Sequence, residues 1–392
     1  MPSTASQSAQ ETCAAARCSA AVQPSGPSIP DIRALNAFAL RSLLSLFDER
    51  ERLFSERVMM RGGRLFRDRT SRRHTLVALL GLHRLTAGGE APPFDIAAAC
   101  DTVLTDVSWV RSAGDFGLLI WFTSVCRPDL LEKTLGDFDF DRALVTYSDG
   151  REGYTTALAW FLTGIAQARL ASPAVSQSLT DVAVDAYRML QNNQGQEGIF
   201  GHAGAARFPR RASYSRLGTF TDQICAIYAL SMFAQAFQVD EPLESALACA
   251  NSICAVQGEL GQWWFLYDKC TGTVVQRYPV LSLHQYGTAP SGLWALSQAT
   301  GRNFDSAILK GVSWITGANE LSSDLRNREP GFIWDSIRLR GRFGKYWSVA
   351  KSFLSASSDG PASDLKIEQE SRSDHLGWLL YALGEFGLPK SS

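Results

Sequence analysis

The sequence lacks several features that would assign it quickly to a class. It has no run of about 18 apolar residues, the length that a membrane-spanning helix needs, and its longest nearly uncharged apolar run is Phe116 to Val125. Its 38 basic and 39 acidic residues give a formal net charge of −1, so no broad field attracts nucleic acid. Its eight cysteines are scattered without a CxxC pair, which favours a reducing compartment. We therefore expect a cytoplasmic protein with neither a nucleic-acid partner nor a membrane span.

The N-terminal segment differs in composition from the rest of the chain. Residues 1–29 are rich in Ser, Ala, Gln and Pro, contain no aromatic residue and lack the apolar core of a secretory signal. We interpret them as a disordered leader. Residues 30–392 are long enough to bury one large core, and we expect a single domain there. The sequence leaves the oligomeric state open.

Two kinds of helical segment alternate from residue 31 onward. The first kind has apolar residues at three- and four-residue spacing and charges on the other side. Its members are Asp31–Phe54, Pro93–Val110, Asp129–Val145, Leu179–Leu190, Pro242–Val256 and Asn303–Thr316. The second kind is apolar almost all round, as in helices buried on every side. Its members are Thr75–Leu85, Phe116–Val125, Tyr154–Ala168, Phe220–Phe237, Thr288–Ala299 and Leu376–Phe386.

This alternation predicts an all-α fold, an (α/α)6 toroid of six helical hairpins. An open two-helix solenoid is the alternative, but it would expose one face of the all-apolar helices. The links from outer to inner helices are long and rich in Arg, Gly and aromatic residues. All of them fall at one end of the barrel, where we expect function. Two β-prone runs, Trp263–Tyr267 and Thr273–Val280, predict a small β-hairpin in one of these loops.

One short pattern occurs twice with a fixed offset. Gln194-x3-Gly198-x-Phe200 recurs as Gln257-x3-Gly261-x-Trp263, 63 residues later (257 − 194 = 63). The match continues, at the same offset, into the apolar segment after each turn. Such self-similarity indicates repeated supersecondary units, and each copy falls between an outer and an inner helix.

The repeated Gln, Gly and aromatic pattern resembles the repeat of the terpenoid cyclase and protein prenyltransferase toroids, with a degraded third copy from Trp314 through Gly331 to Trp334. The resemblance implies an enzyme that acts on an apolar prenyl or terpenoid substrate with an anionic group, by acid/base or carbocation chemistry. The sequence departs from that family, because it has no DxDD motif and no Asp-Asp pair at all. Asp268-x-Cys270 has the spacing of the prenyltransferase zinc ligands, but His284 follows too closely. We expect no cofactor, while Zn or Mg stays open.

The chain also resembles the six-hairpin carbohydrate enzymes, which share this topology. That second resemblance implies a lyase, epimerase or hydrolase that acts on an acidic glycan. A non-catalytic binding toroid is a third possibility, since fold alone does not settle function. The expected partner is therefore a small molecule or an oligosaccharide.

Four of the five histidines lie in or at the end of a loop that leads into an inner helix: His74, His202, His284 and His375. Histidine is well suited to proton transfer near neutral pH. Two acidic residues, Asp222 and Asp374, lie close to inner-helix starts, where N-capping is their simpler role. The predicted catalytic residues are Asp268, His284, Asp222 and His202.

Aromatic and basic residues of the same loops are the candidates for substrate binding. Aromatic faces stack on sugar rings or stabilise carbocations, whereas arginines bind diphosphate, uronate or sulfate groups. The simpler reading is that the aromatic residues pack as core and the arginines carry ordinary loop charge. The predicted binding residues are Trp264, Tyr267, Arg277, Tyr278, Arg211, Arg73, His74 and Trp334.

Overall fold

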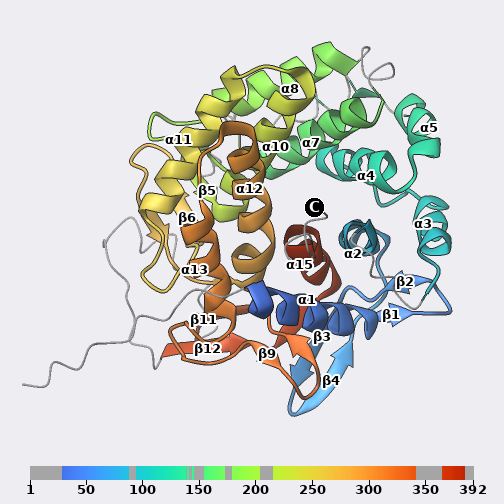
Figure 1. Cartoon of the computed structure of the whole chain (residues 1–392), viewed down its shortest axis with the longest axis vertical. Helices are drawn as coiled ribbons and strands as arrows, with labels where there is room; N and C mark the ends of the chain where they lie inside the picture. The colour runs from blue at the N-terminus through green and yellow to red at the C-terminus, as the bar shows by residue number, and fades with distance from the viewer. Residues whose placement is uncertain are drawn as a thin grey trace, which may run out of the picture.

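Six inner helices form a closed ring in the computed structural model (Figure 1). The structure describes residues 29–87, 94–137, 139–140, 144, 154–172, 179–203, 215–340 and 364–384. Each inner helix packs on the next, and the last packs back on the first. They are α2 (Arg72–Ala87), α4 (Ala113–Cys126), α7 (Thr155–Ala171), α10 (Phe220–Phe237), α12 (Ala289–Thr300) with the π-helical turn η4 (His284–Thr288) before it, and α15 (Ser373–Leu383).

An outer helix precedes each inner helix along the chain and packs outside the ring. The outer helices are α1 (Ile29–Leu44), α3 (Ile96–Leu104), α5 (Leu131–Gly136, after the short turn Pro128–Leu130), α8 (Thr180–Asn192), α11 (Glu241–Ala255) and α13 (Asp305–Ile315). The contacts of α15 with both α2 and α1 join the two ends of the helical array. The predicted α/α toroid is therefore confirmed, and the open solenoid is wrong. None of the described helices is long and apolar enough to cross a membrane.

Glycines allow neighbouring inner helices to approach closely. A Cβ atom on Gly81 of α2 would lie 2.2 Å from the carbonyl oxygen of Gly377 of α15. A Cβ on Gly164 of α7 would lie 2.3 Å from the carbonyl oxygen of Gly117 of α4. No real side chain fits at these distances, so the ring depends on glycine at both contacts.

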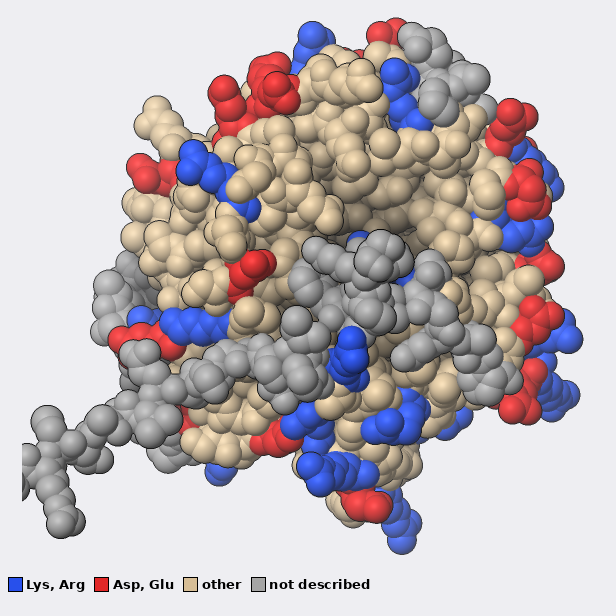
Figure 2. Space-filling model, in the orientation of Figure 1, with Lys and Arg blue, Asp and Glu red and all other residues tan. Residues whose placement is uncertain are grey.

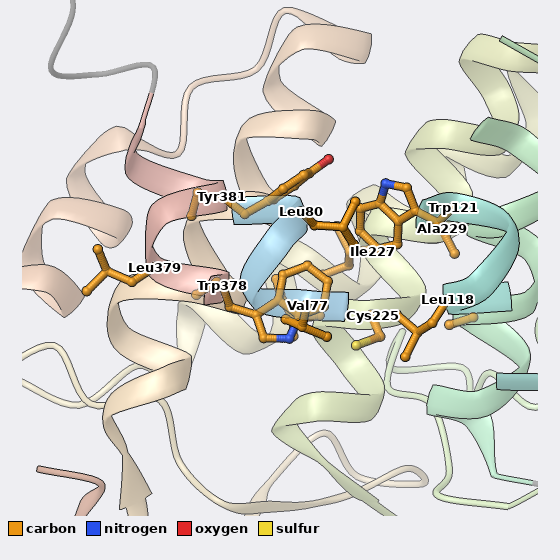
Figure 3. Packing of buried hydrophobic residues seen from close by; sticks show 14 of the residues in the cluster. Val77, Leu80, Leu118, Trp121, Cys225, Ile227, Ala229, Trp378, Leu379 and Tyr381 are labelled. Carbon is orange, nitrogen blue, oxygen red and sulfur yellow. The ribbon is translucent and has the colours of Figure 1, made fainter. Parts of the chain in front are cut away.

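Aromatic side chains from three inner helices meet inside the ring. Trp121 of α4 packs on Tyr228 of α10 and on Trp378 and Tyr381 of α15, with ring centroids 5.3–5.4 Å apart. Figure 3 shows Trp378 and Tyr381 turned toward Trp121, whereas Leu379 points the other way. The hydroxyl groups of Tyr228 and Tyr381 lie 2.8 Å apart. This cluster, which we call the aromatic floor, fills the ring at mid-depth.

The strands are short and belong to the loops between outer and inner helices. The sequence predicted one hairpin, observed as β6 (Leu266–Asp268) and β7 (Val274–Gln276), and missed the others. Those are β1 (Phe47–Asp48), β2 (Leu53–Phe54), β3 (Arg57–Arg61), β4 (Arg64–Arg67), β5 (Leu217–Thr219), β8 (Val280–Leu281), β9 (Arg326–Asn327), β10 (Phe332–Ile333), β11 (Ser336–Leu339), β12 (Leu365–Glu368) and β13 (Glu370–Arg372).

The first outer helix is shorter than predicted. It ends at Leu44 instead of Phe54, and β1 and β2 follow as an antiparallel pair. The carboxylate of Asp48 accepts hydrogen bonds from the backbone N–H groups of Arg50 and Glu51. This interaction is typical of a turn and competes with a continued helix.

The repeated Gln, Gly and aromatic pattern is a structural connection in both copies. The amide of Gln194 donates to the carbonyl oxygens of Gly198 and Ser245, both at 2.8 Å. The amide of Gln257 donates likewise to Gly261 (3.1 Å) and Ala307 (3.0 Å). Each glutamine thus joins its own turn to the next outer helix. We call this pair of bonds the glutamine link.

The third copy joins the last turn to the first outer helix. The hydroxyl of Ser42 in α1 donates to the carbonyl oxygen of Gly331 at 2.6 Å. Gly331 has a φ of +91°, close to the values of +81° at Gly198 and +94° at Gly261. Only glycine adopts such angles without strain. The degraded copy therefore keeps the glycine turn and its place next to an outer helix.

Candidate functional site

The first turns of the inner helices meet at one end of the ring, where several charged and imidazole side chains gather. We call this end the mouth. Asp374 and His375 begin α15, and Nδ1 of His375 lies 3.2 Å from a carboxylate oxygen of Asp335 in the preceding loop. Nε2 of His74, at the start of α2, lies 3.9 Å from Asp374. Figure 2 shows one face of the ring hollowed near its middle.

Asp374 lies above the aromatic floor. Asp374, Trp378 and Tyr381 occupy positions i, i+4 and i+7 of α15, which share one face of a helix. Trp378 and Tyr381 contact Trp121 inside the ring, so Asp374 faces the same interior space, one turn nearer the mouth.

Two arginines connect the mouth to neighbouring elements. Nε of Arg73 donates to Asp115 of α4 at 2.8 Å, and the guanidinium lies 5.1 Å from the ring centroid of Trp160 of α7. Arg372 donates to Glu370 and Asp374 and lies 3.3 Å from Nε2 of His74. Both arginines are therefore neutralised by carboxylates of the chain itself.

The carboxylates at the mouth are held in the charged form. Burial alone would raise the pKa of Asp374, but the charges of His375, His74 and Arg372 lower it to about 2. Burial would likewise raise the pKa of Asp335, but the hydrogen bond and charge of His375, together with Ser336 and Arg372, outweigh it, so this pKa is also lowered. The effect on His375 is reciprocal. Burial favours its neutral form, yet Asp374 and Asp335 raise its pKa above the ordinary value.

His284 has the opposite protonation preference. It is the first residue of η4, is almost fully buried and packs on the ring of Phe220. Its burial, together with the charge of His375, lowers its pKa to about 3. Nε2 lies 3.0 Å from the hydroxyl of Thr221, whereas Nδ1 is buried without a hydrogen-bonding partner among the described residues. His284 is thus a neutral, buried imidazole with one ring nitrogen that has no partner among the described residues.

The structure brings His202 and Asp222 together. Nδ1 of His202 lies 2.8 Å from a carboxylate oxygen of Asp222, and its ring stacks on Tyr154. Asp222 also accepts hydrogen bonds from Thr156 and Thr219, and with Thr219 it forms a capping box at the start of α10. Its carboxylate therefore has a full set of donors, as expected of a structural cap.

His74 is buried at the mouth, beside Arg372 and Asp374. Its burial lowers its pKa, an effect that the nearby charge of Asp374 opposes. Nδ1 has no hydrogen-bonding partner among the described residues, while Nε2 faces Arg372 and Asp374. The predicted binding residues Arg73 and His74 therefore both lie at the mouth.

Asp268 and His284, predicted as an acid/base pair, are not paired in the structure. Arg216 donates to the carboxylate of Asp268 at 2.7 Å, and the backbone N–H of Cys270 donates to its other oxygen. No hydrogen bond or ion pair joins these two described side chains. Strand β6 pairs with β5 and β7, so Asp268 closes the turn of its own hairpin.

Most of the predicted aromatic residues pack as core instead of lining the mouth. Tyr267 and Trp334 are almost fully buried, and Trp264 is 8% exposed. Arg277 lies over Trp264, with 5.1 Å between the guanidinium carbon and the ring centroid, and the hydroxyl of Tyr278 donates to Glu320. Arg211 lies outside the described residues.

The sequence-based candidates omitted the most charged part of the mouth. Asp374 and His375 were noted at inner-helix starts but were not among the predicted catalytic and binding residues, and Asp335 and Arg372 were not noted at all. Asp374 and His375 share the signal that marked the other candidates, a polar residue at the start of an inner helix. Asp335 and Arg372 come from β-structured loops that the helical periodicity does not reveal.

No cluster in the described part of the chain resembles a metal site. There, no group of three or more His, Cys, Asp and Glu side chains is arranged to hold an ion. Asp268, Cys270 and His284, the spacing that left zinc open, do not form such a group.

Comparison with solved structures finds a similar fold in several proteins described as sugar-active enzymes. A sugar epimerase from a ruminal bacterium has a TM-score of 0.60 at 10% identity, covering 92% of this chain and 99% of that one. A possible GH105 member from Klebsiella pneumoniae scores 0.59 at 11% identity, covering 97% and 99%. An unsaturated glucuronyl hydrolase specific for heparin scores 0.56 at 12% identity, covering 91% and 96%.

No family model matches the sequence, and no curated protein does. At these identities the structural similarity establishes the fold alone. None of these structures supports the expected resemblance to terpenoid cyclases or prenyltransferases.

Proposed function

We propose that the chain is a carbohydrate-modifying enzyme that removes a proton from the carbon next to a carbonyl or carboxyl group of a sugar. His284 is the base and His375, oriented by Asp335, is the acid. Return of the proton to the opposite face gives an epimerase, and loss of a neighbouring substituent gives a lyase. Both outcomes share the first step, so one pair of groups serves either reaction.

The observation that carries the proposal is the meeting of His284 and His375 at one mouth above an aromatic floor. Their helices are neighbours, because α15 packs on η4. Their environments shift the two pKa values in opposite directions, which is how enzymes assign a base and an acid to similar groups. Trp160 is only partly buried and offers a ring face on which a sugar can stack.

Hydrolysis is the second candidate, supported by the carboxylates at the mouth and by the hydrolases among the similar structures. Glycoside hydrolysis ordinarily needs one carboxyl group with a raised pKa to protonate the leaving oxygen. Among the described carboxyl groups whose pKa departs from its usual value, every one is lowered. We therefore favour proton abstraction.

Exchange of substrate hydrogen with solvent tests the proposal. Reducing mono- and disaccharides, neutral and uronate-containing, are incubated with the protein in D2O and followed by NMR and mass spectrometry. Epimerisation is expected to leave deuterium at the carbon next to the carbonyl or carboxyl group, whereas elimination is expected to give an unsaturated sugar. The variants His284→Gln and His375→Gln should abolish either outcome.

His83→Gln provides the matched control, because His83 lies late in α2, away from the mouth, and should leave exchange intact. Release of sugar without deuterium uptake and without an unsaturated product would establish the hydrolase instead, because a lyase leaves a new carbon–carbon double bond in one product. Sugar binding without any turnover, unchanged in His284→Gln, would indicate a binding toroid.

A further inference from the structure

A three-stranded sheet leads outward from the mouth. Its strand order is β13-β3-β4, and β13 runs directly into α15 through Arg372. The register places Arg372 opposite Arg57, Glu370 opposite Met59, and Met59 opposite Phe66. Residues that lie opposite each other in a sheet share a face.

One face of this sheet is therefore continuous with the mouth. Because side chains alternate along a strand, it carries Arg57, Met59 and Arg61 of β3, Arg64 and Phe66 of β4, Asp68, and Glu370 and Arg372 of β13. The ion pairs of Arg57 with Asp68 (3.0 Å) and Glu370 (3.1 Å) confirm that these side chains lie together. We call this surface the lip. The other face holds Val58 and Ser371, both buried.

The lip changes in character from the mouth to the tip. Next to the mouth, Arg372 and Arg57 are paired with carboxylates. At the tip, Phe66 is 47% exposed, and Arg61 and Arg64 are exposed. Within the part of the chain that the structure describes, neither of these two arginines forms an ion pair. Figure 2 shows basic side chains gathered at the lower edge, over β3 and β4.

We propose that the lip binds the distal units of an anionic glycan whose terminal sugar occupies the mouth. This inference rests on the proposed function. Phe66 supplies a face for a sugar ring, and Arg61 and Arg64 supply charge for carboxylate or sulfate groups two or more units from the reacting end. The arginines at the mouth are already neutralised, so selectivity for an anionic chain arises at the lip.

A second copy of the chain fits this surface less well. Antiparallel pairing of β4 with another β4 would bring the arginines of RLFR close to those of the partner, and like charges across a strand pair are destabilising. A glycan with negative charges has both the complementary charge and a reason to extend from the mouth.

Isothermal titration calorimetry with a uronate-containing hexasaccharide, the matching disaccharide and a neutral hexasaccharide tests the lip. The double variant Arg61→Ala/Arg64→Ala should weaken binding of the anionic hexasaccharide about 3- to 10-fold and reduce its salt dependence, since exposed charges are screened. Disaccharide binding should not change. Phe66→Ala should weaken both hexasaccharides. Arg188→Ala/Arg302→Ala, which removes two exposed arginines from α8 and from the link after α12, is the matched control.

Equal binding of the anionic hexasaccharide by the double variant and the wild type would overturn the inference. So would equally tight binding of inorganic polyphosphate, which would indicate a general anion surface. If short sugars are turned over and the lip variants change no binding, the inference about the lip fails and the proposed function stands. Lip-dependent binding without turnover of any sugar would remove the proposed reaction and keep a glycan-binding lip.

Discussion

Two successive turns of this toroid share one framework and differ at a single informative position. The turn after α8 and the turn after α11 each have a glutamine link to the next outer helix. Each is also held by a second glutamine from the following inner helix. Gln223 exchanges two hydrogen bonds with the backbone of Phe200. Gln285, with its amide oriented to satisfy both partners, bonds Gly261 and Trp263.

The residue before this second glutamine is Asp222 in one turn and His284 in the other. Both offsets are 62 (285 − 223 = 62 and 284 − 222 = 62), one less than the offset of the turns themselves. The framework therefore presents an equivalent residue at the mouth twice. Asp222 has donors on both oxygens, whereas Nδ1 of His284 has no hydrogen-bonding partner within the described ranges. The comparison teaches that the repeat fixes the position, and that the neighbours decide which hydrogen bonds its residue makes.

The largest expected effect is that of replacing His284, whose Nδ1 has no hydrogen-bonding partner among the described residues. His284→Gln should lower kcat for solvent exchange by about 10²- to 10⁴-fold, because it removes the proposed base. Thermal unfolding should change little, since His284 makes one side-chain hydrogen bond. Steady-state kinetics and calorimetry measure the two quantities. A large loss of stability with unchanged kcat would reverse the roles assigned to the two turns.

Asp222 should show the reverse pattern. Asp222→Ala leaves Thr156, Thr219 and His202 without their acceptor, and an unmatched buried donor is costly. We expect the free energy of unfolding to fall by about 3 kcal/mol. Urea unfolding measures it. Asp222→Asn, which keeps the shape and one acceptor oxygen, should lose less. A variant that unfolds like the wild type would show that the capping box contributes little.

The sequence predicted the framework better than the site, for a physical reason. Amphipathic and all-apolar helices have a period that a single sequence reveals, and the glycine turns recur at a fixed offset. The charged group at the mouth combines Asp335 from one loop with His375 from an inner helix and Arg372 from a strand. Only the closed ring brings them together, and no local pattern encodes that closure.

The predicted binding residues Tyr267 and Trp264 show the same limit. Tyr267 and Trp264 lie in a loop rich in chemistry-bearing residues, but every residue of β6 is buried and Trp264, just before it, is only 8% exposed. An aromatic residue can bind substrate only where its side chain reaches solvent or the interior of the ring. That direction depends on strand register, which the sequence did not specify.

Removing either glutamine link should have a smaller effect on stability, and the effect should be the same for both links. Gln194→Ala and Gln257→Ala each remove two hydrogen bonds to backbone carbonyl groups. Each should lower the free energy of unfolding by about 1–2 kcal/mol, and the two losses should agree within error. Gln276→Ala, a change in a nearby strand outside the links, serves as the control. Unequal losses would mean that the turns are less equivalent than their contacts indicate.

The smallest expected effects are opposite in sign and depend on pH. The folded-state pKa of His284 is lowered to about 3, so its contribution to stability is present above the unfolded value of about 6.5 and is lost as pH falls toward 3. Burial alone would lower the pKa of His202, but Asp222 raises it above the usual value. The contribution of His202 is therefore complete below about pH 6.5 and is lost as pH rises through the folded-state pKa. Urea unfolding of the wild type, His284→Gln and His202→Gln at pH 5.5 and 8 measures both contributions, and that of His284 should be on the order of 1 kcal/mol. Equal signs would contradict the division of the two turns into a charged structural pair and a neutral base.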